Sequence, residues 1–380
     1  MSAQTATPRV KVLHVLGAIL PSGAETMLAS ASQVFSDAGI TSAALSTGES
    51  VGGFAPQLAT RGFAIHHIPF GRSLRFFAQF YKLLKSERFD VVHIHSERAF
   101  FYFILIAWLA RTPRIIRTVH HIFPWAGWLR WRALVQRQIA MRMFGVVFIS
   151  NSTSGGENEL RCYRMRNQII PNWYDSDIFK PRSREQYNRA RAGLGLSEDY
   201  FVLVSLGGNS SYKNYGLVIE AMGLLSEQTN VLYLQVGNQG SGDPLSALVD
   251  KFSTSRRVRC CGRVEEPLSY LNAADCYIMP SSIEGFGVAA AEAMAVGVPA
   301  ILSNRPALKD FASAAKGIVW VECDPVSIAA AVAQLAAESP DELWTRGQAL
   351  AAKMPGYCGL GVGPKMFCEL YRDAEKPTGI

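Results

Sequence analysis

Two glutamates, Glu284 and Glu292, lie eight positions apart around a Gly-Phe-Gly turn, a spacing that could bring both carboxylates to one ligand. The two glycines of this turn, Gly285 and Gly287, let backbone N–H groups approach a ligand closely. The alanine-rich segment 288–296 predicts a helix, whose N-terminus attracts anions. Glu284 can point into the same space, and Glu292, about two helical turns along, can accept hydrogen bonds from hydroxyls such as those of a ribose. Alternatively, both glutamates are solvated. The turn and the Gly-Val-Pro after the helix favour recognition of a phosphate and a sugar.

A second turn, Gly207 to Asn214, lies between a strand-like and a helical apolar segment. Lys213 in this turn would place a positive charge on a diphosphate. Asn209 can donate hydrogen bonds to the same group. An isolated lysine is more often a solvated surface residue, but the position between a strand and a helix favours ligand binding.

Two weaker candidates lie in the N-terminal half of the chain. Gly23, after the first predicted strand, can expose backbone N–H groups toward a diphosphate or an acceptor; alternatively, Ser22 caps an ordinary helix there. His120 ends another predicted strand, where an imidazole can bond a sugar hydroxyl and support positive charge at an anomeric carbon. Alternatively, His120 is a buried histidine satisfied by the backbone. The paired histidines of other predicted strands have no metal-like set of partners and are interpreted as structural: His66, His67, His93 and His95.

Composition indicates a globular protein of more than one domain. The chain has 380 residues, 49% of them hydrophobic, which is too long for one ordinary core. Its net charge of +7 favours anionic partners such as nucleotide phosphates or lipid head groups. No nucleic-acid motif with interleaved aromatic residues is present, so no nucleic-acid partner is expected.

The cysteines and the N-terminus indicate a cytoplasmic protein. Seven cysteines are scattered without a Cys-x-x-Cys pair or a zinc-like histidine spacing, which predicts reduced thiols. Residues 1–8 show no signal-peptide pattern. The longest apolar run, Ala99 to Ala110, is too short to span a bilayer and predicts a buried helix.

Strand-like segments alternate with helical ones in two series, which predicts mostly parallel sheets covered by helices. The strand-like segments are 9–16, 41–45, 65–68, 91–95, 115–119, 146–149 and 168–170, then 201–207, 231–236, 258–261, 276–279 and 300–302. The helical segments are 24–38, 74–85, 100–110, 214–227, 268–273 and 288–296. We therefore predict an α/β fold of two Rossmann-like, doubly wound domains that face each other across a cleft. Residues 1–178 and 199–359 form the domains, and residues 179–198 form a linker with a short helix.

The Glu-x7-Glu segment resembles the signature of retaining glycosyltransferases of family 4, which have the GT-B fold. The resemblance runs from Val10 to about Asp310 and more faintly to the C-terminus. Gly207 to Asn214 resembles the Gly-Arg-x-x-x-x-Lys-Gly element of the family. There are two departures: Ser22 precedes Gly23 where the family has Gly-Gly, and Asn209 replaces the family's arginine, which removes one positive charge from the diphosphate site.

The resemblance implies a hexosyltransferase that uses a nucleotide diphosphate sugar as donor, a hydroxyl group as acceptor, and neither a metal nor a cofactor. The implied catalytic residues are Glu284, His120 and Lys213. The implied donor-binding residues are Glu292, Asn209, Gly208, Gly285, Phe286, Gly287, Val288 and Gly23. The first domain would hold the acceptor and the second the nucleotide sugar, and the C-terminal helix, within residues 360–380, would pack back on the first domain.

No metal ligand is expected from Asp175-Ser176-Asp177, although it looks like the Asp-x-Asp of other glycosyltransferases. The neighbouring sequence resembles the interdomain hinge of family 4, so these aspartates are expected to cap turns.

Residues 124–144 hold three tryptophans interleaved with arginines, a pattern that suits a membrane interface. Alternatively, the tryptophans pack on neighbouring elements. A membrane contact would fit a glycan or lipid-linked acceptor in bacterial surface polysaccharide synthesis, with the enzyme peripheral at the inner face of the membrane.

Two other functions remain open. A sugar-nucleotide epimerase of the same fold would form product without an acceptor. A non-catalytic nucleotide-sugar-binding protein, which Asn209 makes conceivable, would bind the donor without releasing a nucleoside diphosphate.

Overall fold

Strands and helices alternate along the chain in the computed structural model, which describes residues 10–122, 125–238, 244–313 and 317–373. Contacts divide the chain into two units, residues 1–173 with 360–380 and residues 174–359. The predicted linker, 179–198, belongs to the second unit and contains a helix. Parts of three segments discussed above lie outside the described residues: residues 1–9, Pro124 and residues 374–380.

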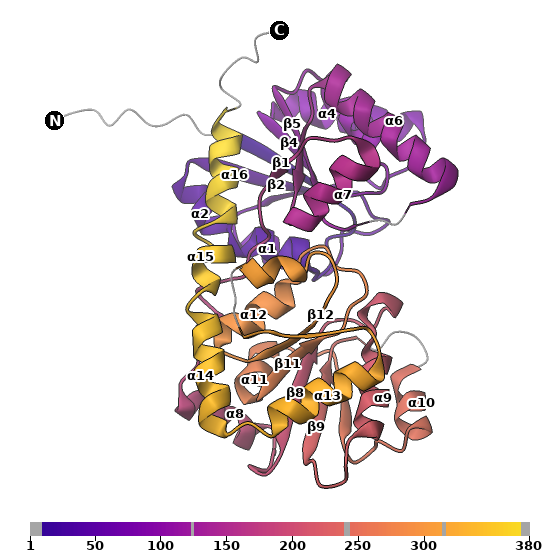
Figure 1. The fold of residues 1–380 in the computed structure, drawn as a ribbon. Coiled ribbons are helices and arrows are strands. Elements are labelled where there is room, and N and C mark those ends of the chain that lie inside the picture. Colours follow the sequence, from indigo (N-terminus) through magenta and orange to yellow (C-terminus); the bar gives the residue numbers. More distant parts are fainter. Residues whose placement is uncertain (1–9, 123–124, 239–243, 314–316, 374–380) are drawn as a thin grey trace, which may run out of the picture. The chain divides into compact units, whose positions relative to one another are not determined.

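The first unit is built on a parallel sheet with the strand order β3-β2-β1-β4-β5-β6-β7 (Figure 1). Its strands are β1 (Val10–Leu16), β2 (Ile40–Ser46), β3 (Ala64–His67), β4 (Val91–Ile94), β5 (Arg114–Val119), β6 (Val147–Ser150) and β7 (Gln168–Ile169). Most residues of β1, β2, β4 and β5 are buried without alternation, because helices cover both faces of the sheet. Its helices are α1 (Gly23–Ser30), α2 (Ser32–Asp37), α3 (Ala55–Thr60), α4 (Leu74–Glu87), α5 (Phe100–Leu109), α6 (Gly127–Phe144), α7 (Thr153–Tyr163) and α16 (Gly363–Arg372).

The helix predicted over 24–38 is divided at Ala31, so that prediction was wrong in its continuity. The backbone of Ala31 has φ −81° and ψ −4°, and this ψ departs from the value of about −42° of an α-helix. The direction of the chain therefore changes at Ala31, and a second helix begins at Ser32. The Met27 carbonyl still accepts the helical hydrogen bond from the Ala31 N–H at 3.1 Å, and it also accepts from the Ser30 hydroxyl at 2.8 Å and the Trp173 indole at 2.9 Å.

Helix α16 packs beside α2 in the first unit, although it follows the second unit in sequence (Figure 1). Arg372 donates to the Ala38 carbonyl, and Arg114 of β5 donates to the Leu370 carbonyl at 3.0 Å. Gly363 allows this packing because a Cβ atom there would lie 2.6 Å from the Trp173 ring. The C-terminal helix is thus tied to the first unit at both ends.

The second unit repeats the architecture with the strand order β10-β9-β8-β11-β12-β13. Its strands are β8 (Phe201–Leu206), β9 (Val231–Val236), β10 (Val258–Gly262), β11 (Cys276–Met279), β12 (Ala300–Ser303) and β13 (Val319–Val321). Its helices are α8 (Arg184–Gly193), α9 (Tyr215–Leu224), α10 (Pro244–Lys251), α11 (Pro267–Ala273), α12 (Val288–Val296), α13 (Pro325–Ala336), α14 (Pro340–Ala351) and α15 (Met354–Cys358). Short 3₁₀ turns occupy Ser211–Lys213 and Lys309–Ser313. The prediction of two parallel, helix-covered sheets is confirmed.

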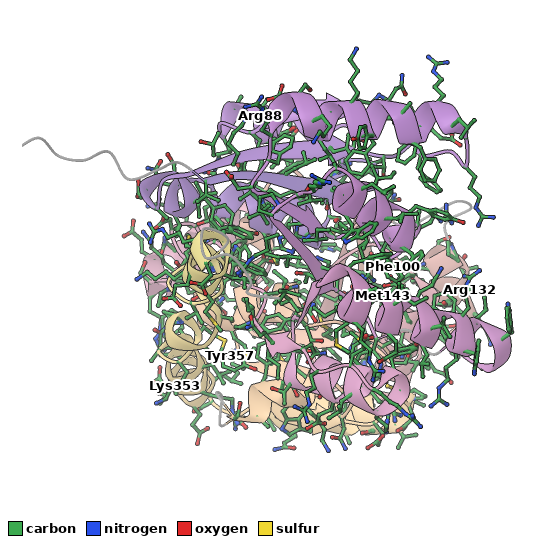
Figure 2. All side chains as sticks on the ribbon, turned by 90° about the horizontal axis from the view of Figure 1, so that it is seen from above. Arg88, Phe100, Arg132, Met143, Lys353 and Tyr357 are labelled. Atoms are coloured by element: carbon green, nitrogen blue, oxygen red, sulfur yellow. The ribbon has the colours of Figure 1, made fainter. Side chains whose placement is uncertain are left out.

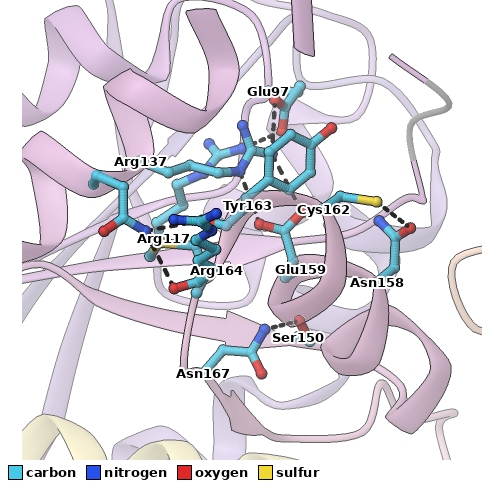
Figure 3. A network of polar contacts seen from close by, with 12 residues as sticks. Glu97, Arg117, Arg137, Ser150, Asn158, Glu159, Cys162, Tyr163, Arg164 and Asn167 are labelled. Atoms are coloured by element: carbon cyan, nitrogen blue, oxygen red, sulfur yellow. Dashed lines mark hydrogen bonds and ion pairs between the residues drawn. The ribbon is translucent and has the colours of Figure 1, made fainter. Parts of the chain in front are cut away.

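A buried charge network fixes the segment that follows β4 (Figure 3). The guanidinium groups of Arg117 and Arg137 are fully buried and share Glu97, and Arg137 Nε also donates to Glu159 at 2.8 Å. Burial alone would raise the pKa of Glu97, but the two arginines hold it below its ordinary value. Arg117 also donates to the Ser96 carbonyl at 2.9 Å. Two arginines and two glutamates therefore cancel in charge and hold the backbone beside His95.

Candidate functional site

The carboxyl ends of β8 and β11 form the core of the candidate site in the second unit. These strands are neighbours, and the chain order reverses between them because β9 lies on the other side of β8. Ligands of doubly wound sheets bind at such a switch point. The predicted turn 207–214 follows β8, and the turn 280–287 follows β11.

Hydrogen bonds tie these two turns together. The Asn214 amide donates to the Pro280 carbonyl at 2.9 Å, and the Ser282 N–H donates to the Tyr212 carbonyl at 2.8 Å. Asn214 is held at φ 57°, the left-handed region that asparagine tolerates better than most residues. The turns therefore act as one scaffold for the side chains between them.

Lys213 and Glu284 contact each other directly across this scaffold. Lys213 Nζ lies 2.5 Å from Glu284 Oε1, and Ser281 Oγ donates to the same oxygen at 2.9 Å. The side chains are 18% and 9% exposed, so the pair is shielded but reachable from solvent. The structure thus brings two of the predicted catalytic residues, a cation and a carboxylate, into contact at one point.

The turn Gly285–Gly287 is buried in the free protein. Phe286 is 3% exposed and packs against Phe311 and Tyr357, with ring centroids 5.3 and 6.3 Å away. Gly287 has φ 93° and precedes the first residue of α12, Val288. The Phe286 side chain therefore belongs to the core, and the approach of the 285–288 backbone to a ligand stays a prediction.

A third loop, after β9, supports Gly208 and Asn209. The Asn209 N–H donates to the Asn238 carbonyl at 2.7 Å. Gly237 has φ 143°, and a Cβ atom there would lie 2.0 Å from the Gly207 carbonyl oxygen. The sequence reasoning missed Gly237, Asn238 and Ser281. Their position directly after predicted strands was the only available signal.

Glu292 is partly exposed on α12 and carries a raised pKa of about 8. Desolvation by burial is the main cause, and the charge of Asp175 adds to it. Glu292 is therefore mostly protonated at neutral pH. Asp175 itself closes a turn, since its Oδ1 accepts from the Asp177 N–H at 3.0 Å, as expected from the sequence.

In the first unit, Gly23 lies at the N-terminus of α1, after β1. It is exposed, and a Cβ atom there would meet nothing within 4 Å, so the space in front of this backbone is open. Ser22 occupies the N-cap position, but its side chain donates to the Glu25 carboxylate instead of capping the helix. The alternative interpretation of Ser22 as a side-chain cap was wrong.

His120 follows β5 and belongs to a cluster of histidines. Its Nε2 lies 3.0 Å from His95 Nδ1, and its carbonyl accepts from the Asn151 amide at 3.1 Å. Burial, with the charges of neighbouring histidines and Arg117, holds the pKa of His120 well below its ordinary value. The neutral ring is thus bonded to another side chain, and not only to backbone as the alternative interpretation supposed.

Comparison with known proteins matches both halves of the chain. Residues 21–178 match the model described as "Glycosyltransferase Family 4", and residues 186–346 match "Glycosyl transferases group 1". The chain therefore belongs to glycosyltransferase family 4.

Among curated relatives, an Escherichia coli UDP-Gal:alpha-D-GlcNAc-diphosphoundecaprenol alpha-1,3-galactosyltransferase is 27% identical over 236 residues. This match covers 59% of the chain and 60% of the relative, which is less than two thirds of its length. The putative glycosyltransferase EpsF of Bacillus subtilis (strain 168) is 24% identical, over 77% of this chain and 79% of that protein.

Solved structures show the same fold at low identity. Anabaena Alr3699/HepE, determined in complex with UDP and glucose, has a TM-score of 0.81 and 18% identity, over 96% of this chain and 100% of that one. WaaG, a glycosyltransferase involved in lipopolysaccharide biosynthesis, has a TM-score of 0.74 and 15% identity, over 97% of this chain and 100% of that one. The predicted GT-B fold is confirmed. Within the described residues, no helix combines the length and apolar character needed to cross a membrane.

Proposed function

We propose that this protein transfers a hexosyl group from a uridine diphosphate sugar to a hydroxyl acceptor, with retention of anomeric configuration. The contact between Lys213 and Glu284 at the switch point of the second unit carries this proposal, since it joins a phosphate-binding group to a hydroxyl-binding group. The uridine base is inferred from the UDP-Gal of the E. coli relative and the UDP of the Anabaena structure.

The donor would use groups that the free protein already holds in place. Lys213 has three N–H donors and gives one to Glu284, so the others can serve the diphosphate. Asn209, Gly208 and the backbone of Gly285–Val288 would add hydrogen bonds to phosphate oxygens. Glu284 Oε1 accepts from Lys213 and Ser281, and we assign Oε2 to a hydroxyl of the donor sugar. Glu292 would hold the ribose. We assign the Gly23 backbone to the diphosphate and His120 to the donor sugar.

The reaction would proceed on one face of the sugar. The bond between the anomeric carbon and the diphosphate oxygen breaks, and its electron pair remains on the leaving diphosphate, which Lys213 stabilises. The acceptor oxygen forms its bond to the same carbon from the same side, and its proton passes to the leaving phosphate. The site needs no nucleophile from the protein, and in this proposal it needs no metal.

We propose a lipid-linked glycan as the acceptor, approached through the N-terminal part of α6 at the membrane surface. Trp128 and Trp131 are 71% and 61% exposed, and their rings are stacked with centroids 6.0 Å apart. Leu129 is 42% exposed beside them, and Arg132 lies on the same helix (Figure 2). Tryptophan and arginine of this kind suit the interface between head groups and acyl chains. The diphosphoundecaprenol acceptor of the E. coli relative has the matching chemistry.

The charge around α6 favours an anionic surface. Residues 98–156 contain eight arginines and no aspartate or glutamate. Of these arginines, Arg117 and Arg137 are buried in ion pairs with Glu97 and Glu159. Others on this segment, including Arg130 and Arg132, are exposed.

The membrane contact is tested by cosedimentation with vesicles that contain phosphatidylglycerol. Binding should fall sharply in W128A/W131A, while L74A, a change at another exposed apolar residue, should bind like the wild type. Equal binding of both variants would remove the membrane contact from the proposal.

Transfer itself is tested with UDP-galactose and UDP-glucose and a diphosphopolyprenyl sugar acceptor. Proton NMR of the new linkage should show the configuration of the donor. E284Q should lower kcat by about a hundredfold, because it removes the charge that holds the sugar beside Lys213. E322Q, at an exposed glutamate of the same unit, is the matched control. Full activity of E284Q would overturn the assignment.

The same assays separate the two alternative functions. An epimerase would convert the donor without an acceptor, and a non-catalytic protein would bind it without releasing UDP. In a catalytic site, N209R should strengthen UDP binding by restoring the family's positive charge. Unaltered UDP affinity in N209R would show that residue 209 lies outside the diphosphate site.

A further inference from the structure

Four buried or half-buried histidines gather within the first unit, and three of them are joined in a chain of hydrogen bonds. His14 on β1 and His93 on β4 are paired in register, and His95 and His120 follow β4 and β5. His14 Nδ1 lies 3.1 Å from His95 Nε2, and His95 Nδ1 lies 3.0 Å from His120 Nε2. This hydrogen-bonded array of His14, His95 and His120 therefore runs from the interior of the sheet to the candidate catalytic residue, His120.

The geometry favours a hydrogen-bonded array over a metal centre. His14, His93 and His95 place ring nitrogens within 4.8 Å of one another, which is compatible with a metal ion. However, His93 Nδ1 lies 2.6 Å from the Tyr371 hydroxyl, and His93 Nε2 lies 2.7 Å from Thr118 Oγ1. Both nitrogens of His93 are thus occupied. Its ring also lies against that of His95, with centroids 4.0 Å apart.

The hydrogens of the array must all point in one direction. Burial lowers the pKa of His14 to about 3 and that of His95 and His120 well below the ordinary value, so the three rings are neutral. A neutral imidazole has one N–H donor and one bare acceptor nitrogen. If His14 donates to His95, then His95 donates to His120, and the remaining hydrogen of His120 is on Nδ1. If the hydrogen bonds point in the opposite direction, from His120 toward His14, Nδ1 of His120 carries no hydrogen.

The buried end of the array decides between these directions. His14 Nε2 is buried and has no hydrogen-bond partner among the described residues. The rings of Phe35, Phe63 and Tyr371 surround His14, and their faces are poor acceptors. A buried N–H without an acceptor is rarer in proteins than an acceptor without a donor. The bare nitrogen therefore belongs on His14 Nε2, and the hydrogens point from His14 toward His120.

We propose that His14 and His95 are positioning residues that hold His120 in the tautomer with hydrogen on Nδ1, so that His120 presents a hydrogen-bond donor to a donor-sugar oxygen. The link to the sugar rests on the proposed function. The tautomer itself is a property of the free protein, so the two claims can fail separately.

The tautomer is measured by long-range proton–nitrogen NMR on the free, ¹⁵N-histidine-labelled protein. Wild-type His120 should carry hydrogen on Nδ1, and hydrogen on Nε2 would overturn the proposal. H14F removes the first donor of the array and should give a mixture of tautomers at His120. H14Q supplies an amide donor and should restore the Nδ1–H form. H66F alters a histidine of β3 that, among the described residues, makes no hydrogen bond to the array, and it should change nothing.

Kinetics and metal titration complete the test. H14F should lower kcat/KM for the donor about fivefold, which corresponds to about 1 kcal/mol for one hydrogen bond, and H14Q should recover it. An unchanged tautomer in H14F would show that His14 does not position His120. Stoichiometric binding of zinc chloride by the wild type, lost in H14F, would identify a metal centre and overturn the array. If the tautomers behave as expected but no sugar is transferred, the proposed function fails and the array stands.

Discussion

Glu292 should couple donor binding to the release of a proton. Its pKa is raised from 4.5 to about 8, chiefly because burial disfavours the charged form and secondarily because Asp175 repels it. At pH 7 such a carboxyl group is protonated in about nine molecules of ten. Ribose hydroxyls bind a carboxylate better than a carboxylic acid, because both oxygens of the carboxylate accept. Binding of UDP at pH 7 should therefore release nearly one proton.

The same pKa sets the effect of pH on stability. The difference between 4.5 and about 8 is about 3.5 pH units, or about 5 kcal/mol at about 1.4 kcal/mol per unit. Because Glu292 is partly exposed, this is an upper bound. The folded chain holds a proton that the unfolded chain has lost between pH 4.5 and 8, so the free energy of unfolding falls as pH rises through this window. E292Q, which mimics the protonated form, should remove this fall.

Calorimetry of UDP binding in buffers of different ionisation enthalpy measures the proton count. The wild type should release about 0.9 proton at pH 7, and E292Q should release none and bind UDP more weakly. D175N is the matched control, because an asparagine keeps the Oδ1 acceptor for Asp177 and Ile178 but removes the charge. It should lower the pKa of Glu292 and reduce the release. Equal proton release by the wild type and E292Q would refute the reasoning.

Three further substitutions test the framework of the two units. R137M leaves Glu159 buried without its ion pair and should lower the free energy of unfolding by about 3–5 kcal/mol in urea denaturation; a loss under 1 kcal/mol would contradict the assigned burial. G237A places a Cβ atom 2.0 Å from the Gly207 carbonyl at φ 143° and should weaken UDP binding measured by calorimetry, whereas G53A, where a Cβ atom meets nothing within 4 Å, should not. G363A forces a Cβ atom against the Trp173 ring and should cost about 1–3 kcal/mol of stability and speed hydrogen exchange in α16; unchanged exchange would show that α16 is not held there.

The fold could be predicted because its signals are local. Segments such as 231–236 and 276–279 are apolar over the length of a strand, and they became β9 and β11 with the predicted bounds. The break at Ala31 could not be predicted, because it is a change of one backbone angle within an apolar pattern that is helical on both sides. The resemblance to family 4, rather than periodicity, supplied the GT-B arrangement, and the comparisons confirm it.

The contacts within the candidate site could not be predicted from the sequence, because they join segments that are far apart in the chain. Lys213 and Glu284 are 71 residues apart, and they meet only because β8 and β11 are neighbours in the sheet. His14 and His95 are 81 residues apart, and neither had an evident partner in sequence. Residue types and their position after strands were enough to nominate candidates. Which of them touch, and which nitrogen or oxygen they use, follows from strand order and register.

The protonated state of Glu292 and the replacement of the family's arginine by Asn209 act on the same quantity, the charge that an incoming diphosphate meets. In the proposed site Lys213 is the nearby cation, and in the free protein its charge is already balanced by Glu284. An ionised Glu292 would then leave a net negative charge where an anion must bind, with no arginine at 209 to offset it. Holding Glu292 neutral removes that repulsion during the approach of the diphosphate. In the proposed site the proton should leave only when the ribose hydroxyls reach the carboxyl group, and a donor with both a diphosphate and a ribose should therefore bind better than either part alone.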